Sequence, residues 1–431
     1  MASKINPTVE HPDYEDLERK YEICDDAFEG DVADYVPPLS DQSASEYKAY
    51  VSRAAYFNMV ERTVTALTGA LTRKPFELSG FTEFPQTDDG NATTFIQESY
   101  RDILLGARVS FLVEVQDNKS KLVQFDADDI INWHGNGTEP GDFVIIAEET
   151  LVPSKENPFE MVCEESWREL YIDPEGFYAV RVWREATSSK DTYVFEDIEP
   201  FLVSGKRINY IPLWVSTPFD NSWEVYNPPL FTQASLNISH FRQATDLAHY
   251  AHFMALPTMT IIGDLYTYTD DEGNQTKAKL KIGSTTEALH LVSGSTAQFT
   301  EVSGSSFSML QNEMKNTEER IYVAGSRLLS SKKGIESVEA LQLRSGSESA
   351  VLNTIVHAVQ SALNGALALC GEIDGVANPG IKLNTDFTAV QLDPQAVSSL
   401  LALYTAGTIS IEQLLNELYS GEIIRNPAQV E

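Results

Sequence analysis

The chain has 431 residues, of which 42% are hydrophobic and 10% aromatic, a composition typical of a globular protein with an apolar core. Its 31 basic and 64 acidic residues give a formal net charge of −33. This charge argues against a protein that grips phosphate backbones, because such proteins need clustered Lys and Arg. It does not exclude a protein past which DNA slides without binding.

The first half of the chain predicts an α+β domain. Apolar residues at three- and four-residue steps predict a helix over Tyr47 to Leu71, which Pro75 keeps from continuing. A second helix is expected over Thr93 to Gly106. From Ala107 to about Phe201, short β-branched and aromatic runs separated by turn residues predict antiparallel strands. Strands beside the early helices indicate the α+β class.

The middle of the chain predicts a small β module between two long helices. The first helix is expected over Phe231 to Phe253 and ends before Pro257. Short strand-like runs follow over Thr258 to Val302, with polar linkers between them. The second helix is expected over Ser306 to Leu329. The chain therefore enters and leaves the β module through helices.

The last part of the chain predicts a loop and further helices. The loop Ser330 to Ser337, SSKKGIES, ends the second helix, and a third long helix follows over Val338 to Gly371. Small residues weaken a helix interior, so the run Ser345-Gly346-Ser347 predicts a kink. After Asp393, a terminal helix pair is expected to turn at Gly407 to Ser410, with Ser410 capping the last helix.

The cysteine spacing and the N-terminal residues do not show the patterns that are typical of secreted proteins. Cys24, Cys163 and Cys370 form no CxxC pair, so neither a zinc knuckle nor a disulfide framework is predicted. A reducing intracellular compartment is the natural expectation. The polar N-terminus has no apolar signal core, and no window approaches the roughly 18 apolar residues that span a bilayer. We therefore expect no membrane association.

Three histidines lie in the helix LNISHFRQATDLAHYAHF and raise the question of a metal site. A helix advances about 100° per residue, so His240 and His249 point to opposite faces. His249 and His252 lie about 60° apart, but no HExxH motif supplies further ligands. Polar positions on a long helix are favoured over a metal site, and we predict neither a metal nor a cofactor.

Motifs for catalysis are absent, and one loop is open to two interpretations. The sequence has no GxxxxGK[ST] phosphate loop, no GxGxxG after a strand and no GxSxG elbow. With 64 acidic residues, any proposed acid–base pair carries no weight. Lys332 and Lys333 lie in SSKKGIES, in a chain that otherwise avoids positive charge. They belong either to a solvated turn or to a mobile finger that touches a polyanion.

The order of these elements, together with a series of short segments, resembles the tailed-bacteriophage portal proteins, which are head–tail connectors. The segments that carry the resemblance cover most of residues 11 to 372 and are His11 to Tyr14, Tyr47 to Asn58, Arg73 to Pro75, Asp128 to Trp133, Pro228 to Leu230, Leu236 to Pro257, Leu280 to Gly283, and Ser337 to Arg344 with Gly346, Glu348 and Ser349. The C-terminal part is similar more loosely, around Gly407 to Ser410.

The resemblance implies an α+β portal fold with named parts. These are a wing (1–227), a first stem helix (228–257), a clip (258–305), a second stem helix (306–329), a tunnel loop (330–337), a long kinked helix with a return to the wing (338–392) and a helical crown (393–431). Only about 39 residues follow Asp393, so the crown is expected to be short.

The function that the resemblance implies is structural, and no enzyme is expected. Copies of the chain, usually twelve, would form a ring at one capsid vertex of the virion, after synthesis in the host cytoplasm. The ring would be the channel for packaging and ejecting double-stranded DNA. The expected partners are further copies of the chain, the major capsid protein, the large terminase and the head–tail adaptor. A portal has no ATPase of its own, in keeping with the missing phosphate loop.

The resemblance also assigns residues to sites. The tunnel loop would line the channel with Ser330, Ser331, Lys332, Lys333, Gly334, Ile335, Glu336 and Ser337. The clip would face the terminase or the adaptor with Tyr266, Tyr268, Asp270, Asp271, Glu272 and Asn274. Two alternatives stay open, a capsid or tail adaptor without a channel and a metal-dependent hydrolase that uses His249 and His252. Adaptors usually lack two stem helices, which argues against the first.

Overall fold

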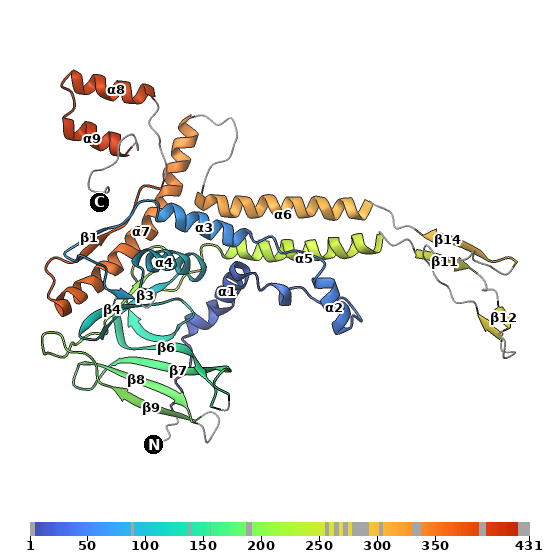
Figure 1. Cartoon of the computed structure of the whole chain (residues 1–431), viewed down its shortest axis with the longest axis horizontal. Coiled ribbons are helices and arrows are strands. Elements are labelled where there is room, and N and C mark those ends of the chain that lie inside the picture. Colours follow the sequence, from blue (N-terminus) through green and yellow to red (C-terminus); the bar gives the residue numbers. More distant parts are fainter. Residues whose placement is uncertain are drawn as a thin grey trace. The chain divides into compact units, whose positions relative to one another are not determined.

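The computed structural model describes residues 5–87, 90–136, 139–155, 157–186, 192–254, 258–262, 267–269, 275–277, 293–300, 305–329, 338–387 and 394–420 (Figure 1). The chain divides into two compact units. Unit 1 comprises Met1–Glu29, Asn58–Ser235 and Val323–Glu431, and unit 2 comprises Gly30–Phe57 and Leu236–Tyr322. Each unit is therefore assembled from distant stretches of sequence.

The helices of unit 1 include three short N-terminal ones and one long one. They are α1 (Pro12–Glu29), α3 (Met59–Leu71), α4 (Ala92–Gly106) and α7 (Val338–Asp374). The spacing of apolar residues in α7 predicts one buried face, and this face is confirmed, since all of its members are buried: Leu352, Val356, Val359, Leu363, Leu367 and Cys370. Helix α7 is continuous through Ser345, Gly346 and Ser347, whose side chains lie outside the described part. A kink there stays a prediction.

The helix predicted over Tyr47 to Leu71 is wrong as a single element. Two helices stand in its place, α2 (Ala44–Val51) and α3, and residues 52–58 are not helical. The reason lies in Asn58, whose side-chain oxygen accepts a hydrogen bond from the backbone N–H of Glu61 and so starts a new helix. The side-chain amide of Asn58 also donates to the carbonyl of Phe28 at 2.6 Å, which fixes the break.

A four-stranded sheet in unit 1 has the order β10-β3-β4-β2 and packs against α7. Its strands are β10 (Leu213–Ser216), β3 (Val109–Gln116), β4 (Lys119–Phe125) and β2 (Gln86–Thr87). The turn residues Asp117 and Asn118, which the sequence places between two strand-like runs, form the turn between β3 and β4, with φ of 51° and 62°. Two successive left-handed residues fit a tight two-residue hairpin. A small pair, β1 (Glu77–Ser79) with β15 (Gly380–Lys382), lies apart from this sheet.

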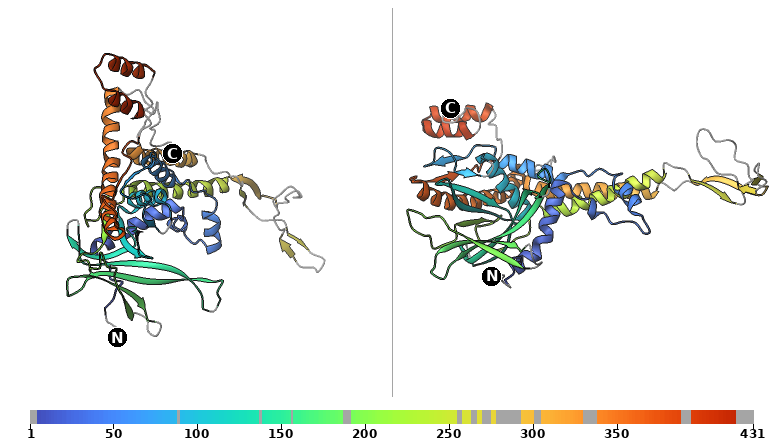
Figure 2. Two further views of the ribbon diagram at one scale, coloured as in Figure 1. Left: turned by 60° about the vertical axis from the view of Figure 1, so that its left-hand side comes forward. Right: turned by 60° about the horizontal axis from the view of Figure 1, so that its bottom comes forward.

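A five-stranded antiparallel sheet completes the strands of unit 1 and confirms the predicted antiparallel region. Its order is β5-β6-β7-β8-β9. The strands are β5 (Ile130–Asn136), β6 (Glu139–Pro153), β7 (Met161–Ile172), β8 (Tyr178–Glu185) and β9 (Tyr193–Ile198). Figure 2 shows this sheet from two further directions. Its inner face joins α1 and β3 in one apolar core, which includes Tyr21, Leu112, Ile130, Val144 and Leu170.

The predicted C-terminal helix pair is confirmed as α8 (Pro394–Thr405) and α9 (Ile411–Ser420). Gly407 lies between them with φ of 71°. The predicted cap at Ser410 is present. Its hydroxyl accepts from the N–H of Gln413 at 3.2 Å, and its own N–H donates to the Gln413 side chain at 2.9 Å. Among the described residues, no helix combines the length and apolar character that a membrane span requires.

Unit 2 contains the predicted helix–strand–helix arrangement. Helix α5 (Phe231–Met254) belongs to unit 2 from Leu236 onward, and α6 (Ser305–Leu329) belongs to it up to Tyr322. Between them lie two antiparallel strand pairs, β11 (Thr258–Ile262) with β14 (Thr296–Thr300), and β12 (Thr267–Thr269) with β13 (Gln275–Lys277). The strands predicted in Ala278 to Gly283 and in Glu287 to Val292 lie outside the described residues.

Candidate functional site

The predicted site residues fall mostly outside the described part of the chain. This holds for the whole tunnel loop, 330–337, and for the clip residues Tyr266, Asp270, Asp271, Glu272 and Asn274. Tyr268 is the middle residue of β12 and pairs with Thr276 of β13. The roles of all these residues stay predictions, and the described structure supplies instead the frame that carries them.

Helices α5 and α6 form an antiparallel hairpin. His240 Nε2 on α5 lies 3.2 Å from Glu318 Oε1 on α6. Farther along α5, the ring of Tyr250 stacks on that of Phe307, with centroids 6.1 Å apart. The contact on α5 thus advances by ten residues, from His240 to Tyr250, while the contact on α6 goes back by eleven, from Glu318 to Phe307, as in an antiparallel pair. His240 is buried in the helix–helix contact, and its partner Glu318 is 51% exposed.

The other end of the same hairpin lies within unit 1. A Cβ atom added at Gly325 of α6 would lie 2.6 Å from the side-chain nitrogen of Gln233 on α5. Gln233 in turn donates to the hydroxyl of Thr63 at 2.7 Å. Glycine at this position lets the two helices approach closely, because any side chain would displace a buried amide. The two helices thus meet at Gln233 and Gly325, at His240 and Glu318, and at Tyr250 and Phe307.

Within unit 2 the segment Gly30–Phe57 braces α5. The guanidinium of Arg242 donates to the carbonyl of Tyr35 at 2.6 Å, and the hydroxyl of Tyr50 donates to the carboxylate of Asp246. Arg53 Nη1 lies 3.2 Å from His249 Nδ1, and the Tyr50 ring meets that of His249 edge-on at 4.9 Å. Burial and the neighbouring Arg53 charge lower the pKa of His249.

The histidines therefore serve packing on two sides of α5. His240 faces α6, and His249 faces α2 and Arg53, which matches the opposite directions expected from helix geometry. In the part of the chain that the structure describes, no three His, Cys, Asp or Glu side chains are grouped to hold a metal ion.

The β module closes the helical hairpin. Three residues separate α5 from β11, and four residues separate β14 from α6. The two strands pair with each other, with Thr258 opposite Thr300. The helical hairpin thus continues directly into a two-stranded ribbon. The β12–β13 pair, which contains Tyr268, is inserted between the two strands of that ribbon.

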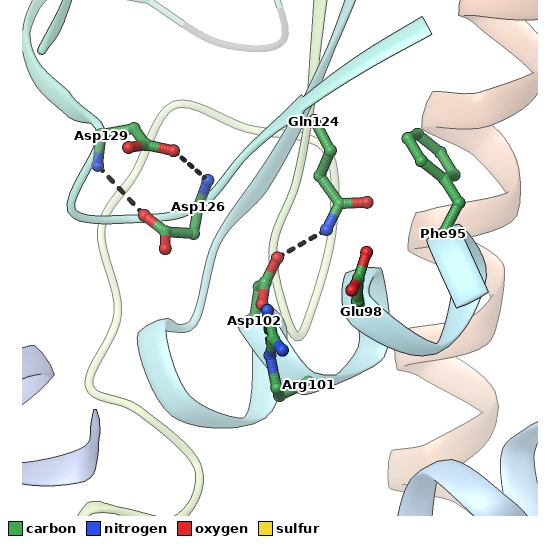
Figure 3. A pocket seen from close by; sticks show the side chains of 7 residues that line it. All are labelled: Phe95, Glu98, Arg101, Asp102, Gln124, Asp126 and Asp129. Carbon is green, nitrogen blue, oxygen red and sulfur yellow. Dashed lines mark hydrogen bonds and ion pairs between the residues drawn. The ribbon is translucent and has the colours of Figure 1, made fainter. Parts of the chain in front are cut away.

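A second feature, a pocket lined with carboxylates, lies in unit 1 (Figure 3). Its volume is about 210 Å³. Helix α4 supplies Phe95, Glu98, Arg101 and Asp102, which recur at helical spacing on one face. Strand β4 supplies Gln124, and the loop after it supplies Asp126 and Asp129. The lining thus includes four carboxylates and one guanidinium.

Hydrogen bonds fix most of these side chains. The carboxylate of Asp102 accepts from Arg101 Nε at 3.1 Å and from Gln124 Nε2 at 2.6 Å. Across the pocket, Asp126 and Asp129 cap each other's backbone, each carboxylate accepting from the other's N–H at 3.1 and 3.0 Å. Figure 3 draws both groups, Asp102 with Gln124 and Asp126 with Asp129. These hydrogen bonds hold each group locally.

Burial raises the pKa values of carboxyl groups in and near this pocket. It raises the pKa of Asp102 to about 7, and the charge of Asp126 acts in the same direction while Arg101 opposes it. Burial, followed by the charge of Asp126, also raises the pKa values of Asp128, Asp129 and Asp25. Among the described residues, these acids belong to no group of three or more side chains that could hold a metal ion.

Sequence reasoning missed this pocket for an identifiable reason. Carboxylates were discounted because they are abundant, and the sequence alone does not tell which few are buried. One signal was present. The run Asp126-Ala127-Asp128-Asp129 follows directly after the apolar end of a predicted strand, where side chains turn back toward the core.

The described parts define a mixed α+β protein whose two-helix hairpin carries a small β module. Residues 229–372, from just before α5 to near the end of α7, match a family described as "Domain of unknown function (DUF4055)". A search of curated proteins finds no match.

Two solved structures illustrate the structural likeness. The chain is similar to a chain of the "Virion of native gene transfer agent (GTA) particle", with 10% identity, a TM-score of 0.40 and coverage of 87% of this chain and 92% of that one. It is also similar to a chain of the "Neck of empty GTA particle computed with C6 symmetry", with 11% identity, a TM-score of 0.40 and coverage of 88% and 93%.

Proposed function

We propose that the chain is a portal protein, which forms a ring at one vertex of a phage-like capsid and conducts double-stranded DNA. One observation carries the proposal. The antiparallel α5–α6 hairpin ends in a β ribbon and is followed by the long helix α7, in the order that the sequence resemblance to portal proteins requires. The hairpin would be the stem, the ribbon the clip, and residues 1–227 the wing.

The contacts between the two helices suit a stem. A channel wall must keep its shape while DNA moves past, and the His240–Glu318 contact and the Tyr250–Phe307 stack oppose sliding of one helix along the other. The net charge of −33 suits the same role, because a wall with few cations does not hold phosphates. DNA would therefore pass in both directions with weak contacts.

The partners follow from the proposed role. Copies of the chain would close a ring through head-to-tail interfaces, with twelve copies as the expected number. The wing would contact the major capsid protein. The clip, with Tyr268 and its neighbouring predicted residues, would meet the large terminase during filling and the head–tail adaptor afterwards. The chain itself would catalyse no reaction.

Negative-stain electron microscopy of the purified protein tests the proposal. We expect rings with a central hole at least as wide as a DNA duplex, roughly 20 Å or more, because the channel must admit the double helix. A chain that stays monomeric across protein concentrations and ionic strengths would contradict the proposal. Closed disks without a hole would point instead to an adaptor that conducts no DNA.

Replacing Lys332 and Lys333 together by Ser tests the tunnel loop. We expect rings to form normally and filled heads to lose DNA more readily, because each lost phosphate contact lowers the affinity for DNA. Each lost contact also reduces the slope of log affinity against log salt concentration by about one. The readout is the fraction of particles that retain DNA as salt is raised.

A matched control for the tunnel loop removes the same charge elsewhere. Lys206 and Lys382 are exposed lysines of unit 1, and their double replacement by Ser is expected to leave DNA retention unchanged. Failure of the Lys332/Lys333 variant to form rings would instead place these lysines at a subunit interface.

A further inference from the structure

The β6–β7 hairpin projects beyond its own sheet. Strand β5 pairs with β6 no farther than Ile146, and β8 pairs with β7 no farther than Trp167. The hairpin nevertheless continues through six more pairs, from Glu148 opposite Ser166 to Pro153 opposite Met161. Among the described strands, these residues pair only with each other. A two-stranded ribbon of this kind is at best marginally stable in water alone.

Apolar side chains gather on one face of the projecting part. Leu151 lies directly opposite Cys163, and Pro153 lies opposite Met161, and the alternation of a strand places all four on the same face. All four are exposed, Leu151 by 66% and Met161 by 52%. Phe159, in the turn that follows, is 95% exposed. We call Leu151, Pro153, Phe159, Met161 and Cys163 the apolar strip.

Two carboxylates face each other at the base of the apolar strip. Glu149 lies opposite Glu165, two residues along from Leu151 and Cys163 and therefore on the same face. Like charges directly opposite in a sheet destabilise it. The Glu149 carboxylate accepts a hydrogen bond from the Cys163 thiol at 3.4 Å, which leaves the repulsion from Glu165 in place. A cation placed between the two carboxylates would remove that repulsion and add charge-assisted hydrogen bonds.

Charge decides which kind of surface fits the apolar strip. The occupant must offer apolar side chains next to a Lys or Arg. A second copy of the chain is a poor source, because acidic residues outnumber basic ones by 64 to 31. Bringing two such copies together here would add carboxylates to a site where Glu149 and Glu165 already repel each other. The complementary surface therefore belongs to a different, more basic protein.

We propose that the apolar strip docks on a different protein of the particle, at a surface that pairs apolar side chains with a Lys or Arg placed between Glu149 and Glu165. The proposal rests on the proposed function in one respect, since it requires the chain to be part of a particle. It goes beyond that function by naming a contact surface in the five-stranded sheet, far along the chain from the clip.

Cys163 provides a built-in probe for this contact. Cys24 and Cys370 are buried, and Cys163 is exposed at the centre of the apolar strip, so maleimide labelling of the folded protein reports on this one position. We expect labelling of assembled particles to be slower than labelling of isolated rings by about tenfold or more, because a covered thiol cannot reach the reagent. Labelled chains are quantified by mass spectrometry, with denatured particles as the reference.

Paired variants separate docking from folding. Leu151→Ser with Met161→Ser is expected to reduce incorporation into particles while isolated rings still form. Val194 and Ile198 on β9 are exposed by 44% and 48% in the same sheet, and their double replacement by Ser is the matched control, expected to incorporate normally. Equal loss for both pairs would overturn the proposal, because it would show a general effect of the sheet.

The outcomes also separate this proposal from the function on which it rests. Particles that contain the chain but label at Cys163 as fast as isolated rings would overturn the docking proposal alone. Protection already present in isolated rings would overturn it too, since the occupant would then be a second copy. Particles that lack the chain altogether would overturn the proposed function.

Discussion

Raising the pH from about 5 to about 8 is expected to lower the free energy of unfolding of unit 1 by several kcal/mol, because its buried carboxyls must then release protons. The pKa of Asp102 lies near 7 in the folded chain against an ordinary value of 3.8. Between these values the folded state binds more protons than the unfolded state, so stability is full at low pH and falls as the pH rises toward 7. Asp102 alone accounts for about 2–3 kcal/mol over this range.

Tryptophan fluorescence during urea unfolding measures this effect in unit 1 specifically. All five tryptophans, Trp133, Trp167, Trp183, Trp214 and Trp223, belong to unit 1. Burial also raises the pKa values of Asp25, Asp128 and Asp129, so their contributions have the same sign as that of Asp102. A stability that stays flat or rises over this range would contradict the assignment of these acids as proton holders.

Two variants separate the buried acid from the general effect of charge. Between about pH 5 and pH 8 the free energy of unfolding of Asp102→Asn is expected to fall by about 2–3 kcal/mol less than that of the unchanged chain, since the amide does not titrate. Asp16→Asn removes the same charge from an exposed position on α1 and is expected to leave the slope unchanged. Equal slopes for the two variants would mean that the overall charge, and not burial of Asp102, sets the pH dependence.

Replacing Gly80 by Ala is expected to destabilise unit 1 by about 3 kcal/mol or more, because backbone strain and overpacking add up there. Gly80 has φ of +78°, which side chains rarely tolerate. A Cβ atom would also lie 2.6 Å from the carbonyl oxygen of Ala377 and 2.8 Å from that of Asn378. These obstacles are backbone atoms next to β15, so relief requires the β1–β15 pair to move.

Gly176 is the matched control for Gly80. Its φ is +89°, but no described atom lies within 4 Å of the place where a Cβ would go. Gly176→Ala is therefore expected to destabilise unit 1 by only about 1 kcal/mol, because it adds backbone strain without overpacking. Urea midpoints of both variants, followed by tryptophan fluorescence, provide the comparison. Similar losses for the two glycines would mean that the close approach at Gly80 is unimportant.

Elements with strong local periodicity were predictable from the sequence. Helix α5 was expected over residues 231–253 and spans Phe231–Met254, and α6 was expected over 306–329 and spans Ser305–Leu329. The buried face of α7 and the cap at Ser410 followed in the same way. In each case the signal is a spacing of apolar residues or a capping side chain, and both are local properties that need no tertiary partner.

Features that depend on distant partners were not predictable. The break between α2 and α3 combines a local cap at Asn58 with a hydrogen bond from Asn58 to Phe28, thirty residues away, and this second contact leaves no local signal. The carboxylate pocket needs α4 and the loop after β4 to meet, and no spacing in the sequence marks Asp102 as buried. Likewise the strand pattern of β6 and β7 does not tell that their ends extend past β5 and β8, since register is set by pairing.

The antiparallel hairpin of α5 and α6 also has an evolutionary consequence. Because the Tyr250 and Phe307 rings stack at 6.1 Å, the chain leaves α5 and returns to α6 at neighbouring points. A segment between two adjacent fixed ends can lengthen at small entropic cost, about 0.6 kcal/mol for each doubling of its length. The residues between the two helices are thus a natural unit of exchange. Recombination there can replace the whole segment without disturbing the two helices that hold it.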